Sequence, residues 1–174
     1  MTPSRGACDG SAHRGLAVQA LDADTFAAFG TVIAPGAEGQ GFGARDAVLD
    51  LTQGTPRFYT MRLRHRPLCV YRITRHRRTT QVLAAAGGHD WWIVVAPPHE
   101  VDNEMARPCL DDIRAFCVPG DTAVMLFKGT WHAGPYFTAD EASFFNLELA
   151  DTNVTDHQSC DLVACYGTAL LLQA

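Results

Sequence analysis

The chain has 174 residues, which is enough for one domain with a hydrophobic core and too few for two ordinary domains joined by a linker. Apolar residues make up 47% of it and charged residues 19%, a composition that excludes a disordered chain. The 15 glycines and 9 prolines exclude a coiled coil, and the net charge of -5 argues against a nucleic-acid partner. No apolar run approaches the roughly 20 residues that span a bilayer, so we expect no membrane partner.

The first residues of the chain mix Gly, Ser, Pro and charge without periodicity. This pattern predicts a flexible arm at 1–15, followed by a single domain at 16–174. The same stretch lacks the apolar segment of a signal peptide, so we expect a cytoplasmic protein. Six cysteines without a CxxC pair fit neither a zinc module nor a small disulfide scaffold.

The first ordered element is predicted to be a short helix, with Asp22 or Asp24 as its N-cap and Gly30 as its end. Residues 31–33 then begin a strand, and the glycine-rich stretch 35–43 forms a loop. Short segments rich in β-branched and aromatic residues, bounded by Gly, Pro or Asp, predict strands at 58–63, 68–74, 79–84, 91–96, 113–118, 122–127 and 143–149. Since no helix-length segments separate them, we expect an all-β antiparallel sandwich or barrel with one or two short helices. The last six residues fit either a strand or a helix.

Arginine is concentrated in one part of this acidic chain. Between Leu51 and His89 there is no Asp or Glu, and eight of the 14 basic residues lie there, namely Arg57, Arg62, Arg64, Arg66, Arg72, Arg75, Arg77 and Arg78. A guanidinium group facing a cavity would bind a carboxylate through two parallel hydrogen bonds, and strand alternation favours Arg62 or Arg72 for that place. The alternative for most of them is a solvated strand face or a partner surface.

Two histidines stand at the ends of predicted strands. Strand alternation places His76 on the same face as Arg72. Gln81 and Gly88 follow His76 in the pattern H-x4-Q-x6-G, and a glycine-led turn at 128–132 delivers His132. Two histidines and a glutamine at strand ends predict a shared site in one cavity.

These two segments resemble the two motifs of the cupins. Thr74 and Gln81 stand in place of the first His and the Glu of the first motif, and Phe127 replaces the usual Pro of the second. The resemblance implies a jelly-roll barrel and a homodimer. It also implies a divalent metal as the candidate cofactor, held if present by His76, Gln81 and His132, although this ligand set is incomplete.

Within the cupins, the chain from about Val18 to Asp161 resembles the ureidoglycolate lyase family. The matching features are L-x4-F-x2-F-G-x-V-I at 21–33, Gly54 before Arg57-Phe58, Arg75-His76 before Gln81, the strand 93–95, the run 113–116, and Gly129-x-Trp131-His132. Members of this family cleave ureidoglycolate to glyoxylate and urea, a step of purine and allantoin degradation. The resemblance therefore implies a carbon–nitrogen lyase with a small anionic substrate.

The chemistry of that cleavage suggests roles for the candidate residues. Loss of urea needs a base for the hydroxyl and an acid for the departing nitrogen, which makes His76 or His132 the candidate for proton transfer. The substrate carboxylate needs a cationic partner, for which Arg72 and Arg57 are candidates. The remaining candidates are Gln81 and Asn146 as partners of the urea group, Glu148 as a further polar group and Trp131 as a wall of the pocket.

Two alternatives stay open at this point, because a fold does not determine a function. One is a metal-dependent isomerase, decarboxylase or dioxygenase of another small carboxylic acid. The other is a non-catalytic cupin that binds a small molecule. Metal analysis of the purified protein would test the first, and turnover of ureidoglycolate would test the second.

Overall fold

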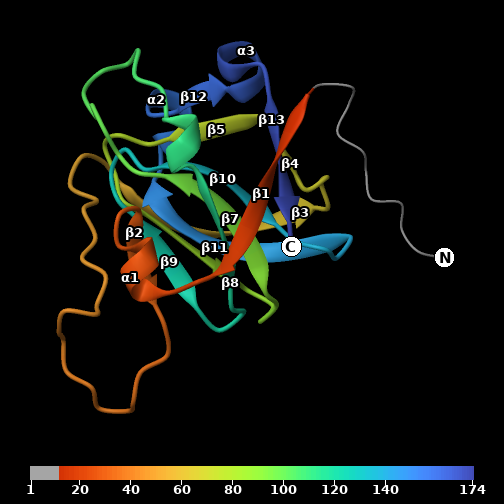
Figure 1. The fold of residues 1–174 in the computed structure, drawn as a ribbon. Helices are drawn as coiled ribbons and strands as arrows, with labels where there is room; N and C mark the ends of the chain where they lie inside the picture. Colours follow the sequence, from red (N-terminus) through yellow and green to blue (C-terminus); the bar gives the residue numbers. More distant parts are fainter. Residues whose placement is uncertain (1–11) are drawn as a thin grey trace.

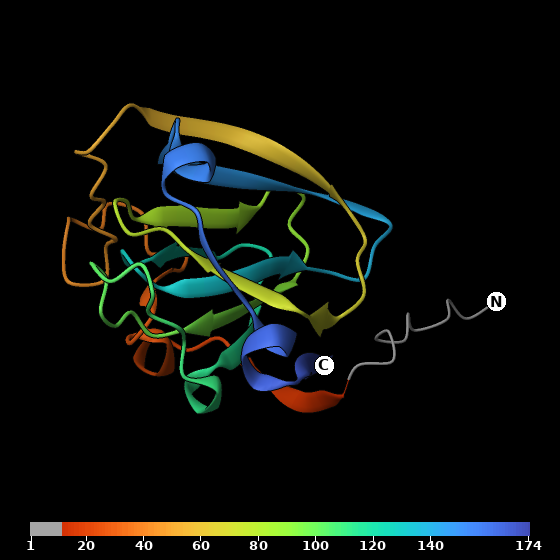
Figure 2. The same cartoon turned by 90° about the horizontal axis from the view of Figure 1, so that it is seen from above.

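The computed structural model describes residues 12–174, which fold into two curled β-sheets (Figures 1 and 2). The first sheet contains, in spatial order, β12 (Gln158–Asp161), β5 (Arg72–Arg75), β10 (Trp131–Tyr136), β7 (Trp91–Ala96), β8 (Arg114–Val118), β1 (His13–Ala20), β13 (Ala169–Gln173) and β4 (Cys69–Val70). The second contains β2 (Gly30–Ile33), β9 (Ala123–Leu126), β6 (Gln81–Ala85), β11 (Glu141–Leu149) and β3 (Pro56–Arg64). The sheets form a half-barrel, which confirms the predicted all-β, cupin-like fold.

Helices are few and short in the described part of the chain. They are α1 (Ala23–Phe26), α2 (Thr152–Thr155), α3 (Leu162–Tyr166) and one turn of 3₁₀ helix at Leu110–Asp112. Asp22 is the N-cap of α1, because its side chain accepts hydrogen bonds from the main-chain N–H groups of Asp24 and Thr25. The predicted loop at 35–43 contains neither helix nor strand.

Two sequence predictions about strands need correction. β1 begins at His13, so the last residues of the expected arm belong to a strand; residues 1–11 of that arm lie outside the described residues. β1 also pairs in parallel with both β8 and β13, so the barrel is not purely antiparallel. The start of β1 is polar, contains glycine and shows no alternation of polar and apolar residues. Its partner strands lie about a hundred or more residues further along the chain, so nothing near it in the sequence indicates the pairing.

The predicted strand 68–74 is divided between two parts of the first sheet. β4 pairs with β13, whereas β5 pairs with β10 and β12. The alternation that places Arg72, Thr74 and His76 on one face nevertheless holds, since all three line the same pocket. The C-terminal segment, left open between strand and helix, is the strand β13.

Two hydrophobic cores occupy the two faces of the first sheet. β7 illustrates the alternation: Trp91, Ile93 and Val95 face the second sheet, and Val94 and Ala96 face the opposite side. The core between the sheets also includes Leu83, Val124, Leu126 and Phe144 from the second sheet. Polar side chains from both sheets line a pocket next to this core.

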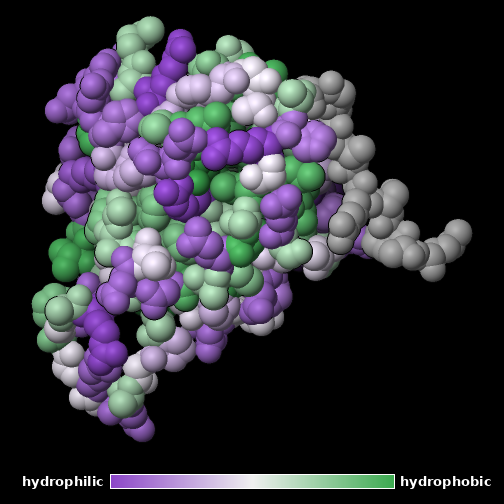
Figure 3. All heavy atoms as spheres, viewed as in Figure 1, coloured by the Kyte–Doolittle hydropathy of each residue, from purple (hydrophilic) through white to green (hydrophobic). Residues whose placement is uncertain are grey.

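The surface combines polar and apolar residues. Figure 3 shows hydrophilic and hydrophobic residues interspersed over the face seen in Figure 1. On β3 and β11, the exposed rings of Phe58 and Phe145 stack with centroids 5.5 Å apart. Within residues 12–174, no helix has the length and apolar character needed to cross a membrane.

Candidate active site

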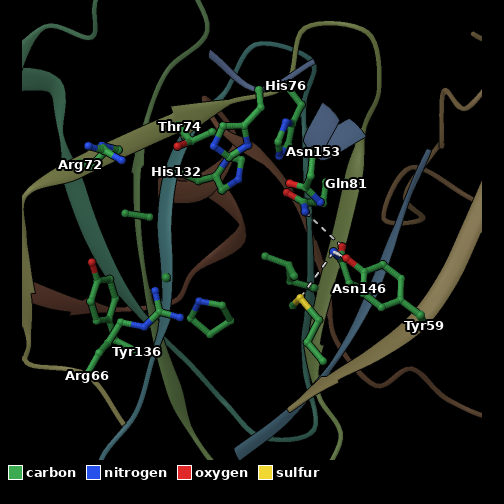
Figure 4. A pocket seen from close by; sticks show the side chains of 16 residues that line it. Tyr59, Arg66, Arg72, Thr74, His76, Gln81, His132, Tyr136, Asn146 and Asn153 are labelled. Carbon is green, nitrogen blue, oxygen red and sulfur yellow. Dashed lines mark hydrogen bonds between the residues drawn. The ribbon is translucent and has the colours of Figure 1, made fainter. Parts of the chain in front are cut away.

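A pocket with a volume of about 330 Å³ lies between the two sheets (Figure 4). One wall comes from the first sheet, and we call it the histidine wall; it contains Arg72, Thr74, His76 and His132, and His157 adjoins it. The other comes from the second sheet, and we call it the amide wall; it contains Tyr59, Met61, Gln81, Leu83 and Asn146. Arg66, Gly134, Pro135, Tyr136 and Asn153 complete the lining together with Ala133.

His76 stands just after β5, and its imidazole is held by the turn that precedes β12. Its Nδ1 lies 2.6 Å from the main-chain oxygen of Asp156, which can only accept a hydrogen bond. Nδ1 therefore carries the proton, and Nε2 keeps its lone pair. The Asp156 carboxylate accepts hydrogen bonds of 2.8 Å from the main-chain N–H groups of both Arg77 and Arg78, which fixes the turn around His76.

His132 occupies the second residue of β10, directly opposite Thr74 of β5. Its Nδ1 lies 3.2 Å from the main-chain oxygen of Thr130, so His132 has the same tautomer as His76. The two imidazole centroids are 5.0 Å apart. The main-chain N–H of Gly129 donates to the main-chain oxygen of His76 over 2.6 Å, which joins the two histidine segments directly. Gly129 has φ +80, a left-handed conformation that favours glycine at this turn.

Burial keeps both histidines neutral at ordinary pH. It lowers the pKa of His132 to about 3, and the neighbouring His76 contributes to that shift. Burial also lowers the pKa of His76, but there the hydrogen bond to the Asp156 carbonyl and the charges of Glu148 and Asp156 oppose the shift. Of the two uncharged imidazoles, His76 is therefore in the environment that better supports accepting a proton.

The amide wall is organised by hydrogen bonds between side chains. Gln81 Nε2 donates to Asn146 Oδ1 over 3.1 Å and to Glu148 Oε2 over 3.0 Å. Asn146 Nδ2 donates to the Tyr59 hydroxyl over 2.9 Å, and that hydroxyl donates to Glu148 Oε1 over 2.9 Å. Burial, followed by the neighbouring Glu148, raises the pKa of Tyr59, so the phenol keeps its proton. These four residues form a closed ring.

Two arginines supply positive charge to the lining of the pocket. Arg72 and Arg66 are both exposed, and Figure 4 shows Arg72 on the side of Thr74 and Arg66 beside Tyr136. The guanidinium carbon of Arg66 lies 5.8 Å from the centroid of the Tyr136 ring. These two guanidinium groups give the pocket lining positive charge, which favours a small anionic ligand.

A family model described as ureidoglycolate lyase matches residues 13–169. The chain belongs to the ureidoglycolate lyase family. No curated protein was found to match it. The family assignment makes the protein a lyase that cleaves ureidoglycolate, and the pocket described above provides imidazoles, amides and guanidinium groups for such a substrate.

Some residues predicted for the site of this lyase line the pocket, and others do not. The structure brings together His76, Gln81, His132, Arg72 and Asn146. The other predicted residues lie elsewhere. Trp131 is fully buried on the opposite face of β10, with the Arg75 guanidinium 4.7 Å from its ring centroid. The guanidinium carbon of Arg57 lies 3.7 Å from the centroid of the Tyr59 ring, and neither Arg57 nor Arg62 lines the pocket. Glu148 is buried behind the amide wall, where it accepts hydrogen bonds and does not line the pocket.

Sequence reasoning missed several pocket residues of the lyase. His157, which lies in no motif of the sequence analysis, has its ring centroid 5.7 Å from that of His76. Asn153 lies in α2 and His157 in the turn that follows it. This segment has no strand alternation, so its sequence does not indicate where these side chains point. Tyr59 and Arg66 belong to the arginine-rich part of the chain, where strand alternation favoured Arg62 or Arg72 and gave no indication of these two residues.

The cupin metal set does not fit this pocket. Among the described residues, no group of three or more His, Cys, Asp or Glu side chains is arranged to hold a metal ion. His76, His132 and His157 line the pocket but are not arranged as a set of metal ligands, Thr74 stands in place of a further histidine, and the neutral amide of Gln81 is a weak ligand. The carboxylate of Glu148 is already occupied by three donors. We therefore assign the chemistry to the side chains alone.

Proposed function

We propose that this pocket is the active site in which ureidoglycolate is split into glyoxylate and urea by elimination. The hydroxyl group loses its proton, and the O–H electron pair forms the carbonyl of glyoxylate. The carbon–nitrogen bond breaks, its electron pair goes to the nitrogen, and that nitrogen takes up a proton to give urea. No net proton is gained or lost, so one well-placed group can move the proton from oxygen to nitrogen.

In this proposal, His76 is the group that moves the proton. Its main-chain hydrogen bond to Asp156 directs the protonated Nδ1 away and leaves Nε2 as the acceptor. The nearby carboxylates stabilise the imidazolium that forms for a moment during transfer. His132, whose pKa is about 3, serves as a hydrogen-bond acceptor that orients the substrate hydroxyl beside His76. The observation that carries the proposal is this pair of imidazoles in one pocket, with centroids 5.0 Å apart and each anchored through Nδ1 to a main-chain oxygen.

The remaining pocket residues hold the substrate. Arg72 shares a strand face with Thr74 and His76 and is proposed to bind the carboxylate through its two-pronged guanidinium group. Gln81 and Asn146, on the opposite wall, are proposed to contact the urea group. This arrangement would hold the breaking bond between the two walls, with the histidines on the side of the hydroxyl.

The direct test is product analysis with each enantiomer of ureidoglycolate. We expect equimolar glyoxylate and urea from one enantiomer, with no ammonia, because a hydrolytic reaction at the ureido carbonyl would release ammonia instead. A matched reaction with His76→Ala should lose most of the rate. The proposal is refuted if the purified protein produces no glyoxylate from either enantiomer.

We also propose that the enzyme is a homodimer in the cytoplasm. β3 is a nine-residue strand at the edge of the second sheet, and the stacked pair Phe58 and Phe145 is exposed beside that edge. Long exposed edges and apolar surfaces of this kind are commonly covered by a second subunit. Sedimentation should give twice the chain mass of 18.9 kDa at micromolar concentration, and the mass of one chain would contradict the dimer. Cell fractionation tests the predicted location.

A further inference from the structure

The donor and acceptor roles in the hydrogen-bond ring of the amide wall are fixed, and Glu148 is the residue that fixes them. This side chain is 1% exposed, and a carboxylate can only accept hydrogen bonds. Tyr59 and Asn153 both donate to its Oε1, over 2.9 and 3.0 Å, and Gln81 donates to its Oε2. Each neighbour of Glu148 must therefore present a hydrogen atom to it.

The two amides of the ring have no freedom to turn over. Since the Tyr59 hydroxyl donates to Glu148, its oxygen is left to accept from Asn146 Nδ2. Asn146 must then present Oδ1 to Gln81, and Gln81 Nε2 uses its two N–H groups on Asn146 Oδ1 and Glu148 Oε2. A flipped Gln81 would place its oxygen against the Glu148 carboxylate and lose both bonds.

The ring leaves Gln81 Oε1 without a hydrogen-bond donor. The Gln81 side chain is 6% exposed, and its Oε1 is buried without a hydrogen-bond partner among the described residues. Figure 4 shows the Gln81 amide with its nitrogen toward Asn146 and its oxygen toward the side of the histidines. A buried acceptor without a donor costs free energy, so a ligand that brings a donor to it recovers that cost.

We propose that Gln81 Oε1 is the acceptor that selects an N–H group of the substrate, and that Glu148 is the positioning residue that holds Gln81 in this orientation. The proposal rests on the proposed function, since it assigns the ureido group to the amide wall. Ureidoglycolate has N–H donors on both sides of its carbonyl, whereas an acid or ketone of the same shape has none. The site should reject such an analogue because Gln81 Oε1 would stay unpaired.

Two unreactive ligands of equal size isolate this contact. N-carbamoylglycine is ureidoglycolate without its hydroxyl, so it keeps the carboxylate and the ureido N–H groups but cannot eliminate. 4-Oxopentanoate has CH₃ and CH₂ where N-carbamoylglycine has NH₂ and NH, and is otherwise identical in heavy-atom shape. In the wild-type protein, calorimetry or competition should show that N-carbamoylglycine binds about 10-fold to 100-fold more tightly.

Two variants test the two residues separately. Gln81→Met keeps the length of the side chain and removes the acceptor, so the preference should fall to about one. Glu148→Gln converts an acceptor-only anchor into a group that can also donate, which lets Gln81 turn its nitrogen toward the pocket and should likewise abolish the preference. Glu141→Gln, an exposed change on the same strand, is the matched control and should keep the wild-type preference.

The outcomes separate this proposal from the proposed function. Equal affinity of the wild-type protein for both ligands would overturn it even if ureidoglycolate is cleaved. A preference that survives in both Gln81→Met and Glu148→Gln, with circular dichroism showing that both are folded, would also overturn it. If the preference depends on Gln81 and Glu148 but no glyoxylate is formed, the result supports the selection of N–H groups and refutes the lyase reaction in this pocket.

Discussion

The two walls of the pocket are built on different principles. On the histidine wall, His76 and His132 are each anchored to a main-chain oxygen, and their Nε2 atoms have no partner in the wall itself. On the amide wall, the polar side chains are anchored to one another in a closed ring that leaves one oxygen over. The first arrangement presents lone pairs that can take a proton, and the second presents a fixed acceptor that cannot.

This difference indicates a division of labour. Groups that change protonation need neighbours that do not have to change with them, and main-chain carbonyls meet that need. Groups that recognise a shape and a donor pattern need a rigid orientation, which a ring of mutually satisfied amides supplies. Changes on the histidine wall should therefore lower the rate, and changes on the amide wall should alter which ligand binds.

The largest effect is expected from removing the proton-transfer group. His76→Ala should lower kcat by about 10²-fold to 10⁴-fold, which is the usual contribution of general acid–base catalysis. Affinity for N-carbamoylglycine should change little, because the carboxylate and ureido contacts remain. Steady-state kinetics with calorimetry checks both quantities. A His76→Ala variant that loses affinity for N-carbamoylglycine and keeps kcat would contradict the different roles assigned to the two walls.

A smaller effect on the rate is expected from the cation of the histidine wall. Arg72→Lys replaces a two-pronged guanidinium with a point charge, so KM for ureidoglycolate should rise about 10-fold with a smaller change in kcat. Arg62→Lys, in the same stretch but outside the pocket, is the matched control. An unchanged KM in Arg72→Lys would contradict this role and indicate that Arg66, which also lines the pocket, binds the substrate carboxylate.

The buried histidines should make stability depend on pH. The pKa of His132 is about 3 in the folded protein and near 6.5 in an unfolded chain, so between these values the unfolded state binds a proton that the folded state excludes. Its contribution to the free energy of unfolding should therefore fall as the pH is lowered from about 6.5, by about 1 kcal/mol per pH unit. Urea denaturation at pH 7 and pH 5 should show a smaller loss in His132→Gln than in the wild-type protein. Equal losses would contradict the neutral state of His132.

No effect is expected from metal removal. The pocket lacks the ligand set of a metal cupin, so dialysis against a chelator should leave the rate of ureidoglycolate cleavage unchanged. The control is the same dialysis followed by addition of divalent metals. A lost rate that a metal restores would contradict the assignment of the chemistry to side chains alone.

The sequence predicts the histidine wall better than the ring of the amide wall. His76 and His132 lie in short motifs at strand ends, and local alternation places Arg72 on the same face as His76, so their convergence could be anticipated. The ring of the amide wall could not, because Tyr59 and Glu148 are 89 residues apart and meet only through the pairing of β3 with β11. Glu148, predicted only as a further polar group of the site, lies buried behind the wall and accepts hydrogen bonds from Tyr59 and Gln81.

The same limit explains the strand that was missed. β1 lies between two strands from distant parts of the chain, and both pairings are parallel. Its first residues are polar and include Gly15, and only Leu16 and Val18 alternate toward a core, so the local signal is too short to predict the strand. His157 was missed for a related reason, since it reaches the pocket from a turn.

Chemical rescue of His76→Ala by imidazole tests the central claim most directly. The variant should cleave ureidoglycolate slowly, and imidazole diffusing into the space of the missing ring should restore part of the rate in a saturable way, while His132→Ala serves for comparison. This result would show that a proton acceptor at the position of His76 carries the reaction. A His76→Ala variant that turns over at the wild-type rate without imidazole would contradict the account.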